Sequence, residues 1–191
     1  MRRFLLLLPF PLLSPPGVSA ALVIHPLAWP AEAAVPLTDG FDFPVGPPHA
    51  KGFTDAQPFG THHHLGSDWN AITGGATDLG APVYAAAHGT VVYARDAGPG
   101  WGNVVRVLHR TAQGPIETVY AHLDRIDVTD GDLLQRGTQL GTIGDAHGRY
   151  VPHLHFELRT IVGMDLGPGY ARNSDGWVDP TAYILAHRPV R

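Results

Sequence analysis

A single stretch of eight residues, Pro152 to Arg159, limits what this chain can fold into more than any other part of the sequence. In it, hydrophobic residues alternate with histidines and charged residues. Successive side chains of a β-strand point to opposite faces, so this alternation predicts a half-buried strand with one hydrophobic face and one chemical face. The core face would carry Leu154, Phe156 and Leu158, and the other face His153, His155, Glu157 and Arg159.

The two histidines of this stretch indicate a metal-binding or catalytic site. His153 and His155 are two residues apart, a spacing of about 7 Å between Cα atoms in a strand. Two imidazoles at that spacing can both contact one metal ion or one bound water. We therefore interpret this strand as one wall of a zinc hydrolase site.

Composition bounds the fold and excludes several classes of function. The 191 residues fit one domain with an irregular extension, and 23 Gly and 18 Pro predict the turns and short elements of an all-β protein. The absence of cysteine excludes disulfides, thiolate catalysis and cysteine-type zinc sites, so a metal site must use His, Asp and Glu. With a net charge of -4, the chain lacks the basic surface expected of a nucleic-acid-binding protein.

Residues 1–20 have the three parts of a secretory signal peptide: a basic start, an apolar run from Phe4 to Leu13, and small residues up to Ala20. The alternative is a membrane anchor. However, the run contains two prolines and is well short of the about 20 apolar residues that a span needs. We therefore predict an exported protein, periplasmic or secreted, with no membrane span after cleavage.

Residues 21–60 are predicted to form an irregular lead-in. They are rich in proline and show no sustained hydrophobic period of 2 or 3.6. Phe41, Phe43 and Val45 are the candidates for anchoring this segment across the domain.

Residues 61–160 are predicted to form the β domain, because short apolar runs alternate there with Gly and Pro turns. Residues 161–191 are predicted to form an extension. In this extension, Asp179 followed by Pro180 is typical of a helix start, and the short helix should end near His187.

The strand predicted over residues 117–123 supplies another histidine. Apolar residues at positions 119, 121 and 123 alternate there with residues at positions 118, 120 and 122. Strict alternation places His122 on a polar face, opposite a core face.

His64 and Asp68 form a further pair. In an extended strand they would lie about 13 Å apart, too far to share an ion. Gly66 and Ser67 allow the chain to fold back between them. A His, an Asp and a second His would supply the three protein ligands of a catalytic zinc, but spacing alone does not tell which histidines ligate.

Six short segments follow one another in a characteristic order: His64-Leu65-Gly66-Ser67-Asp68, Ala81-Pro82-Val83-Tyr84-Ala85 with Gly89-Thr90-Val91-Val92, Trp101-Gly102-Asn103-Val104-Val105, Tyr120-Ala121-His122-Leu123, Gly131-Asp132 with Arg136-Gly137 and Gly141, and Pro152-His153-Leu154-His155-Phe156-Glu157. In this order they resemble the lysostaphin-like (LytM-type) zinc metalloendopeptidases. The resemblance implies an antiparallel β-sandwich with a groove, of the barrel-sandwich hybrid type. It also implies an enzyme that cuts the peptide stems or cross-links of bacterial cell-wall peptidoglycan.

The resemblance further implies residue roles. One Zn²⁺ per chain would be held by His64, Asp68 and His155. His153 would act as the general base beside the metal-bound water, and His122 as the oxyanion stabiliser. Glu157 is either a partner that orients an imidazole, a member of an ion pair with an arginine, or a solvated carboxylate.

Two departures from the family pattern bear on substrate choice. The segment from Asn70 to Gly80 is longer than the link that many family members have, and the loop from Asp145 to Val151 carries His147. We interpret the remaining histidines as surface or structural residues: His62, His63, His88, His109, His147 and His187.

Other functions stay open at this stage. One is a non-catalytic or partner-dependent activator of other cell-wall hydrolases, a role that goes with lost metal ligands. Another is a zinc peptidase that acts on exported proteins. A biotinyl or lipoyl carrier domain is set aside, because the single lysine, Lys51, lies in the lead-in rather than at a hairpin tip.

Overall fold

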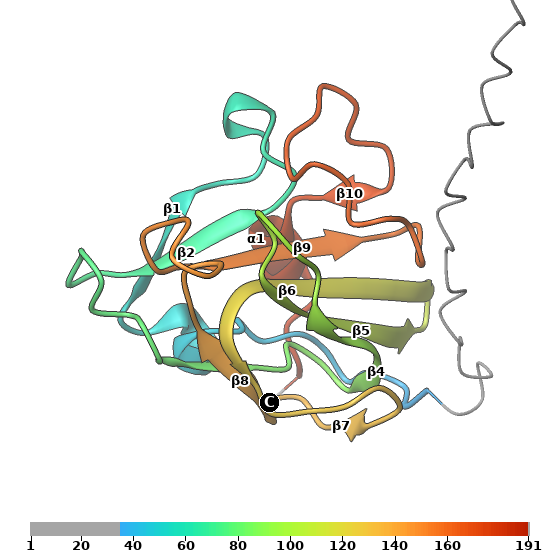
Figure 1. The fold of residues 1–191 in the computed structure, drawn as a ribbon. Helices are drawn as coiled ribbons and strands as arrows, with labels where there is room; N and C mark the ends of the chain where they lie inside the picture. The colour runs from blue at the N-terminus through green and yellow to red at the C-terminus, as the bar shows by residue number, and fades with distance from the viewer. Residues whose placement is uncertain (1–34, 191) are drawn as a thin grey trace, which may run out of the picture.

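β-Strands make up most of the regular structure of residues 35–190, the part of the chain that this computed structural model describes (Figure 1). The elements are β1 (Phe53–Gln57), β2 (Ser67–Ala71), β3 (Pro82–Tyr84), β4 (Gly89–Asp96), β5 (Asn103–Thr111), β6 (Gly114–Ile126), β7 (Leu133–Leu134), β8 (Gln139–Ile143), β9 (Leu154–Arg159), β10 (Trp177–Val178) and α1 (Pro180–Ala186), with short helical turns at Gly46–Ala50 and Thr61–His63. The predicted all-β antiparallel fold is confirmed. The predicted signal peptide lies outside the described residues.

The strands join into one hydrogen-bonded network with the order β1-β2-β9-β6-β5-β4-β7. Strand β6 belongs to two parts of this network, because residues 117–121 pair with β9 and residues 123–126 pair with β8. Strand β8 also pairs with β3. Figure 1 shows the resulting bend of β6. Tyr120 and Leu123 of β6 both lie in the main hydrophobic core.

Strand β9 contains the alternation of hydrophobic and polar residues on which the sequence prediction rests. Its three hydrophobic side chains are buried in the core, as predicted. The prediction of a half-buried strand is wrong, because Glu157 and Arg159 on the other face are also fully buried. The segment after β9 covers them: Arg159 donates to the carbonyl oxygens of residues 164–166, and Glu157 accepts from the indole of Trp177.

Strand β6 contains a β-bulge that strict alternation does not predict. Its register with β5 shifts between Tyr120 and Leu123, and His122 has a φ of 63°. The prediction that Tyr120 shares a polar face with His122 is wrong, since Tyr120 packs in the core against Phe156. The bulge adds one residue to the strand and so turns His122 away from the core and towards His155, with ring centroids 5.5 Å apart.

The described part of the lead-in is anchored as predicted, since Phe41, Phe43 and Val45 are all buried in the core. The lead-in is not irregular throughout, however. Its residues 53–57 form β1, which pairs with β2 at one edge of the sheet. The sequence did not indicate this strand because its alternate residues are only half-buried, and the pairing with β2 decides its conformation.

Helix α1 begins and ends where the sequence predicts. The side chain of Asp179 caps it by accepting from the amide of Ala182, and Pro180 occupies the first turn. Ile184 buries the inner face of the helix in the core. No helix among residues 35–190 is long and apolar enough to cross a membrane.

The buried His109 on β5 generates a prediction about acid stability. Its Nδ1 lies 2.8 Å from the carbonyl oxygen of His88 and its Nε2 lies 2.7 Å from the hydroxyl of Thr118, so the neutral ring is fully hydrogen-bonded. Burial lowers the pKa of His109 from 6.5 to about 4. Below pH 6.5, His109 therefore binds a proton in the unfolded chain but stays neutral in the folded protein. The free energy of unfolding falls as the pH drops towards 4.

We expect this single group to cost about 3 kcal/mol of unfolding free energy between pH 6.5 and 4. His109→Gln should flatten that part of the pH profile, measured by urea denaturation of the chelator-treated protein. His49→Gln, at an exposed histidine, is the control and should leave the profile unchanged. An equally steep profile for both variants would contradict the assignment.

Candidate metal centre and groove

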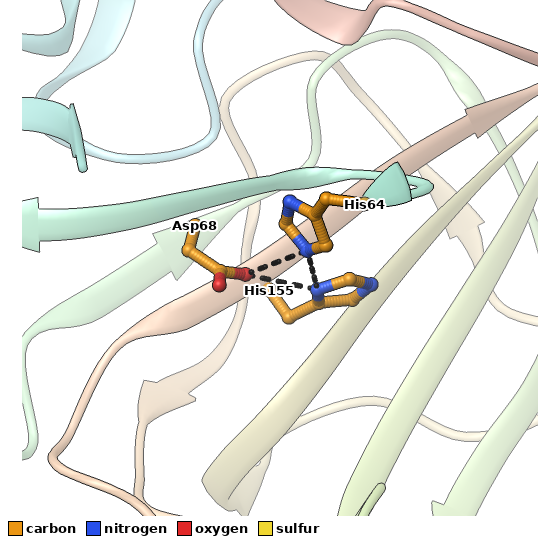
Figure 2. Close-up of side chains that lie close together, drawn as sticks. All are labelled: His64, Asp68 and His155. Carbon is orange, nitrogen blue, oxygen red and sulfur yellow. Dashed lines mark hydrogen bonds and ion pairs between the residues drawn. The ribbon is translucent and has the colours of Figure 1, made fainter. Parts of the chain in front are cut away.

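Two paired strands bring the predicted ligands together. Asp68 on β2 lies directly opposite His155 on β9 in the antiparallel register. His64 precedes β2, and the turn through residues 65–67 returns its ring to Asp68. Figure 2 shows the three side chains converging on one point.

The three donor atoms form a tight triangle. The Nε2 atom of His64 lies 3.0 Å from Nδ1 of His155 and 3.3 Å from Oδ1 of Asp68, and the latter two atoms are 2.9 Å apart. Tetrahedral zinc with bonds of about 2.0–2.1 Å needs ligand atoms about 3.3–3.4 Å apart. Small shifts of a few tenths of an ångström would therefore admit the ion, and the two nitrogens and one oxygen are donors that zinc prefers. The residues fit the metal that the sequence predicts.

Each ligand imidazole is oriented through its other nitrogen. Nδ1 of His64 donates to the carbonyl oxygen of Gln57, at 3.0 Å. Nε2 of His155 donates to Oε1 of Glu157, also at 3.0 Å. Such hydrogen bonds fix the orientation of the ring, and they direct its other nitrogen inward, where it can bind a metal once it is deprotonated. Glu157 thus orients a histidine and also pairs with Arg159.

The charges of the site are set by these contacts. Burial favours the neutral carboxyl group of Asp68, but hydrogen bonds from His155 and His64 outweigh it and hold the pKa of Asp68 well below its usual range. Burial likewise opposes protonation of His155, yet its hydrogen bonds to Asp68 and Glu157 raise its pKa to about 9. A cation that binds Nδ1 of His155 must therefore displace a proton.

His153 and His122 lie next to this triangle, with their ring centroids 4.8 Å apart. Each ring is held by Nδ1, which donates to the carbonyl oxygen of Val151 in His153 and of Trp101 in His122. Nε2 of His153 lies 3.7 Å from Oδ1 of Asp68. Burial, together with the nearby charges of His155 and His153, lowers the pKa of His122 to about 3. All five predicted site residues therefore lie together.

The site lies in a groove, and several of the groove residues were not predicted. Trp101 lines the groove, whereas Trp69, the middle residue of β2, packs in the core. Gln57 of β1, the loop residues Arg149 and Tyr150, and residues 167–170 complete the walls. No periodicity marks such loop residues, so only their position in the fold identifies them.

The C-terminal extension builds one wall of the groove. The indole of Trp101 donates to the carbonyl oxygen of Gly167 at 3.1 Å. Tyr170 stacks on the ring of His64 at 4.9 Å and accepts a hydrogen bond from the side chain of Gln57 at 2.9 Å. The lead-in and the extension thus meet beside the metal site.

The remaining histidines do not join this site. His109 is a buried structural residue. His147 in the loop before β9 is paired with Asp96 at 3.2 Å and is not among the residues that line the groove.

The family profile of the M23 peptidases, described as Peptidase family M23, matches residues 62–168, more than half of the chain. The chain belongs to this family. The match covers all five site residues and ends within the extension that forms the groove wall.

Two curated relatives illustrate the similarity. The cell division protein DipM of Caulobacter vibrioides is 42% identical over 80 residues, which are 42% of this chain and 13% of DipM. The peptidoglycan DD-endopeptidase ShyB of Vibrio cholerae is 40% identical over 96 residues, which are 50% of this chain and 20% of ShyB. The chain therefore spans only a small part of the length of these relatives.

Solved structures agree on the fold. The antimicrobial peptidase lysostaphin from Staphylococcus simulans superimposes with a TM-score of 0.51 at 23% identity, over 70% of this chain and 48% of lysostaphin. The catalytic domain of the prophage-encoded M23 protein EnpA from Enterococcus faecalis, as its A109H mutant, gives 0.52 at 24% identity, over 75% of this chain and 97% of that domain. The predicted lysostaphin-like fold is confirmed.

The ligand triangle predicts the effect of removing one donor. His155→Ala leaves two ligands, so we expect the loss of stoichiometric zinc after dialysis, measured by atomic absorption. His147→Ala, which removes an exposed histidine outside the triangle, should keep one zinc per chain. A His155→Ala protein that retains one zinc per chain would refute the ligand assignment.

The hydrogen bond from His155 to Glu157 predicts a smaller effect. Glu157→Gln weakens this orienting contact, and we expect zinc affinity to fall about 10- to 100-fold, measured by competition with a chromogenic chelator. Glu117→Gln is the matched control, because Glu117 is equally buried and paired with Arg106 but contacts no ligand. Equal affinity losses in the two variants would indicate a general effect of removing a buried charge.

Proposed function

We propose that this protein is a zinc-dependent metalloendopeptidase that hydrolyses peptide cross-links of bacterial peptidoglycan, in the periplasm or outside the cell. The observation that carries the proposal is the convergence of three donor atoms and two further imidazoles on one groove. Membership of Peptidase family M23 supports the peptidase class. The similarity to ShyB, named as a peptidoglycan DD-endopeptidase, supports the substrate class.

The chemistry follows from the arrangement of the chain's own groups. A zinc ion held by His64, Asp68 and His155 would supply a Lewis acid that lowers the pKa of a bound water to about 7. His153 is suited to take the proton from that water, because its Nδ1 is already bonded and its Nε2 faces the ligand triangle. The low pKa of His122 makes it a poor proton acceptor.

His122 is suited to the oxygen of the attacked carbonyl group. In the neutral ring its Nδ1 proton is donated to Trp101, so Nε2 must be protonated before it can donate to an oxyanion. Burial and neighbouring positive charge oppose that protonation in the resting site. Negative charge that develops on the substrate would favour it, so His122 would contribute most in the transition state.

Two alternatives remain. A non-catalytic activator would not need the five residues, and this chain keeps all of them in one place. A peptidase for exported proteins would use the same chemistry, and the choice between the two substrates depends on an assay.

Digestion of purified cross-linked peptidoglycan tests the proposal. We expect the mature protein to convert cross-linked dimers to monomers, and we expect a zinc chelator to stop the reaction. Chromatography with mass detection measures both. A zinc-loaded protein that changes no muropeptide but cleaves an exported protein would favour the second alternative. Inactivity on both substrates would favour the activator.

Loss of the proposed base separates chemistry from metal binding. His153→Ala should keep one zinc per chain and lower kcat by about 10²- to 10⁴-fold, measured on the same cross-linked substrate. His62→Ala, at an exposed histidine outside the groove lining, is the control. Loss of zinc from His153→Ala would mean that His153, rather than His155, is the ligand.

A further inference from the structure

The groove contains one cation that the fold has not paired with an acid. Six of the nine arginines within residues 35–190 form ion pairs with carboxylates: Arg95, Arg106, Arg125, Arg136, Arg159 and Arg188. Arg149 has no such partner among the described residues. It is also the one Lys or Arg among the described residues that line the groove. Its charge is therefore available to a bound molecule.

The loop before β9 holds the backbone of Arg149 in place. The amides of Arg149 and Tyr150 both donate to the carbonyl oxygen of Asp145, at 2.9 and 3.0 Å. The side chain of Asp145 accepts from the amide of Gly148 at 2.7 Å. The side chain of Ala146 is buried, and this burial also holds the loop against the rest of the protein. The backbone that carries this cation is therefore already ordered before a ligand binds, which lowers the ordering cost of binding.

Tyr150 links this cation to the two histidines of the proposed mechanism. The guanidinium of Arg149 lies over the Tyr150 ring, 5.7 Å from its centroid, and Nε donates to the Tyr150 hydroxyl at 3.2 Å. The same ring lies 5.0 Å from His122 and 5.9 Å from His153. These separations place the guanidinium within about three residues of an extended peptide from the reacting bond.

Outside the proposed metal centre, the described lining residues add no charge besides Arg149. The other described lining residues of the groove are glycines, prolines, aromatic rings, one glutamine and the site residues themselves. The carboxylate of Asp68 is already engaged by His64 and His155. A guanidinium in such surroundings favours a carboxylate, which it can bind through two parallel hydrogen bonds.

The geometry points to Arg149 as a specificity-determining residue that binds a carboxylate of the peptide substrate, no more than about three residues from the cleaved bond. This inference rests on the proposed peptidase function. The carboxylate belongs either to the C-terminus of the peptide or to a side chain, and both have the same chemistry.

Matched peptides test the inference. Each peptide keeps one scissile bond and carries a free carboxylate or a carboxamide, placed either at the C-terminus or on a side chain near that bond. We expect the zinc-loaded protein to prefer one carboxylate form about 10- to 100-fold in kcat/KM, mainly through KM. The position at which amidation abolishes the preference identifies the source of the carboxylate. The preference should shrink in 1 M salt, because the guanidinium is exposed.

Variants assign the preference to the residue. Arg149→Gln should cleave the acid and amide peptides equally, and Arg149→Lys should restore only part of the preference, since an ammonium group lacks the fork geometry. Arg172→Gln is the matched control, because Arg172 is also exposed and lies outside the groove lining. It should keep the full preference.

Two results would overturn the inference: equal cleavage of acid and amide peptides by the unaltered protein, or an unchanged preference in Arg149→Gln. A binding experiment distinguishes failure of this inference from failure of the peptidase function. In it, tryptophan fluorescence reports the binding of the same peptides to chelator-treated protein. If the acid peptides bind selectively through Arg149 but the zinc-loaded protein does not cleave them, the proposed peptidase function is refuted. The inference that Arg149 binds a carboxylate then stands. Cleavage without selectivity would refute the subsite alone.

Discussion

The pairing of β2 with β9 is the constraint on which the rest of the site depends. It places Asp68 directly opposite His155, and cross-strand neighbours are close enough for their side chains to meet. A shift of one residue in this register would turn His155 into the core and the hydrophobic face of β9 outwards. The burial of that hydrophobic face therefore also fixes the positions of Asp68 and His155. The free energy that stabilises the fold also stabilises the geometry of the candidate metal site.

A buried layer of charge connects the metal centre to the groove wall. Glu157 receives hydrogen bonds from His155, Arg159 and Trp177, and Arg159 in turn holds the carbonyl groups of residues 164–166. Buried ion pairs are costly unless every group finds a partner, and here each one does. Trp177 lies beyond the residues that match the family profile, so the extension of this chain contributes to the environment of the candidate metal site.

The bulge in β6 shows how backbone strain serves the site. A positive φ is uncommon for a residue other than glycine, and such conformations persist only where the surrounding structure holds them. Here two hydrogen bonds to the carbonyl oxygen of Trp101, from the backbone amide and from Nδ1, hold His122 in this conformation. Because Tyr120 packs in the core, regular alternation from Tyr120 would turn His122 into the core as well, and the bulge turns it to the groove instead.

The sequence by itself determined the all-β class, the core face of β9 and the capped helix after Asp179, and it singled out five candidate site residues that the fold brings together. These depend on local rules: a period of two, a capping side chain, and short motifs whose order is specific. Tertiary structure decided what local rules do not contain. It paired residues 53–57 with β2, buried Glu157 and Arg159 under the extension, turned His122 by a bulge, and placed Arg149 in the groove. Each of these depends on contacts between segments far apart in the chain, and no period within a single segment records such contacts.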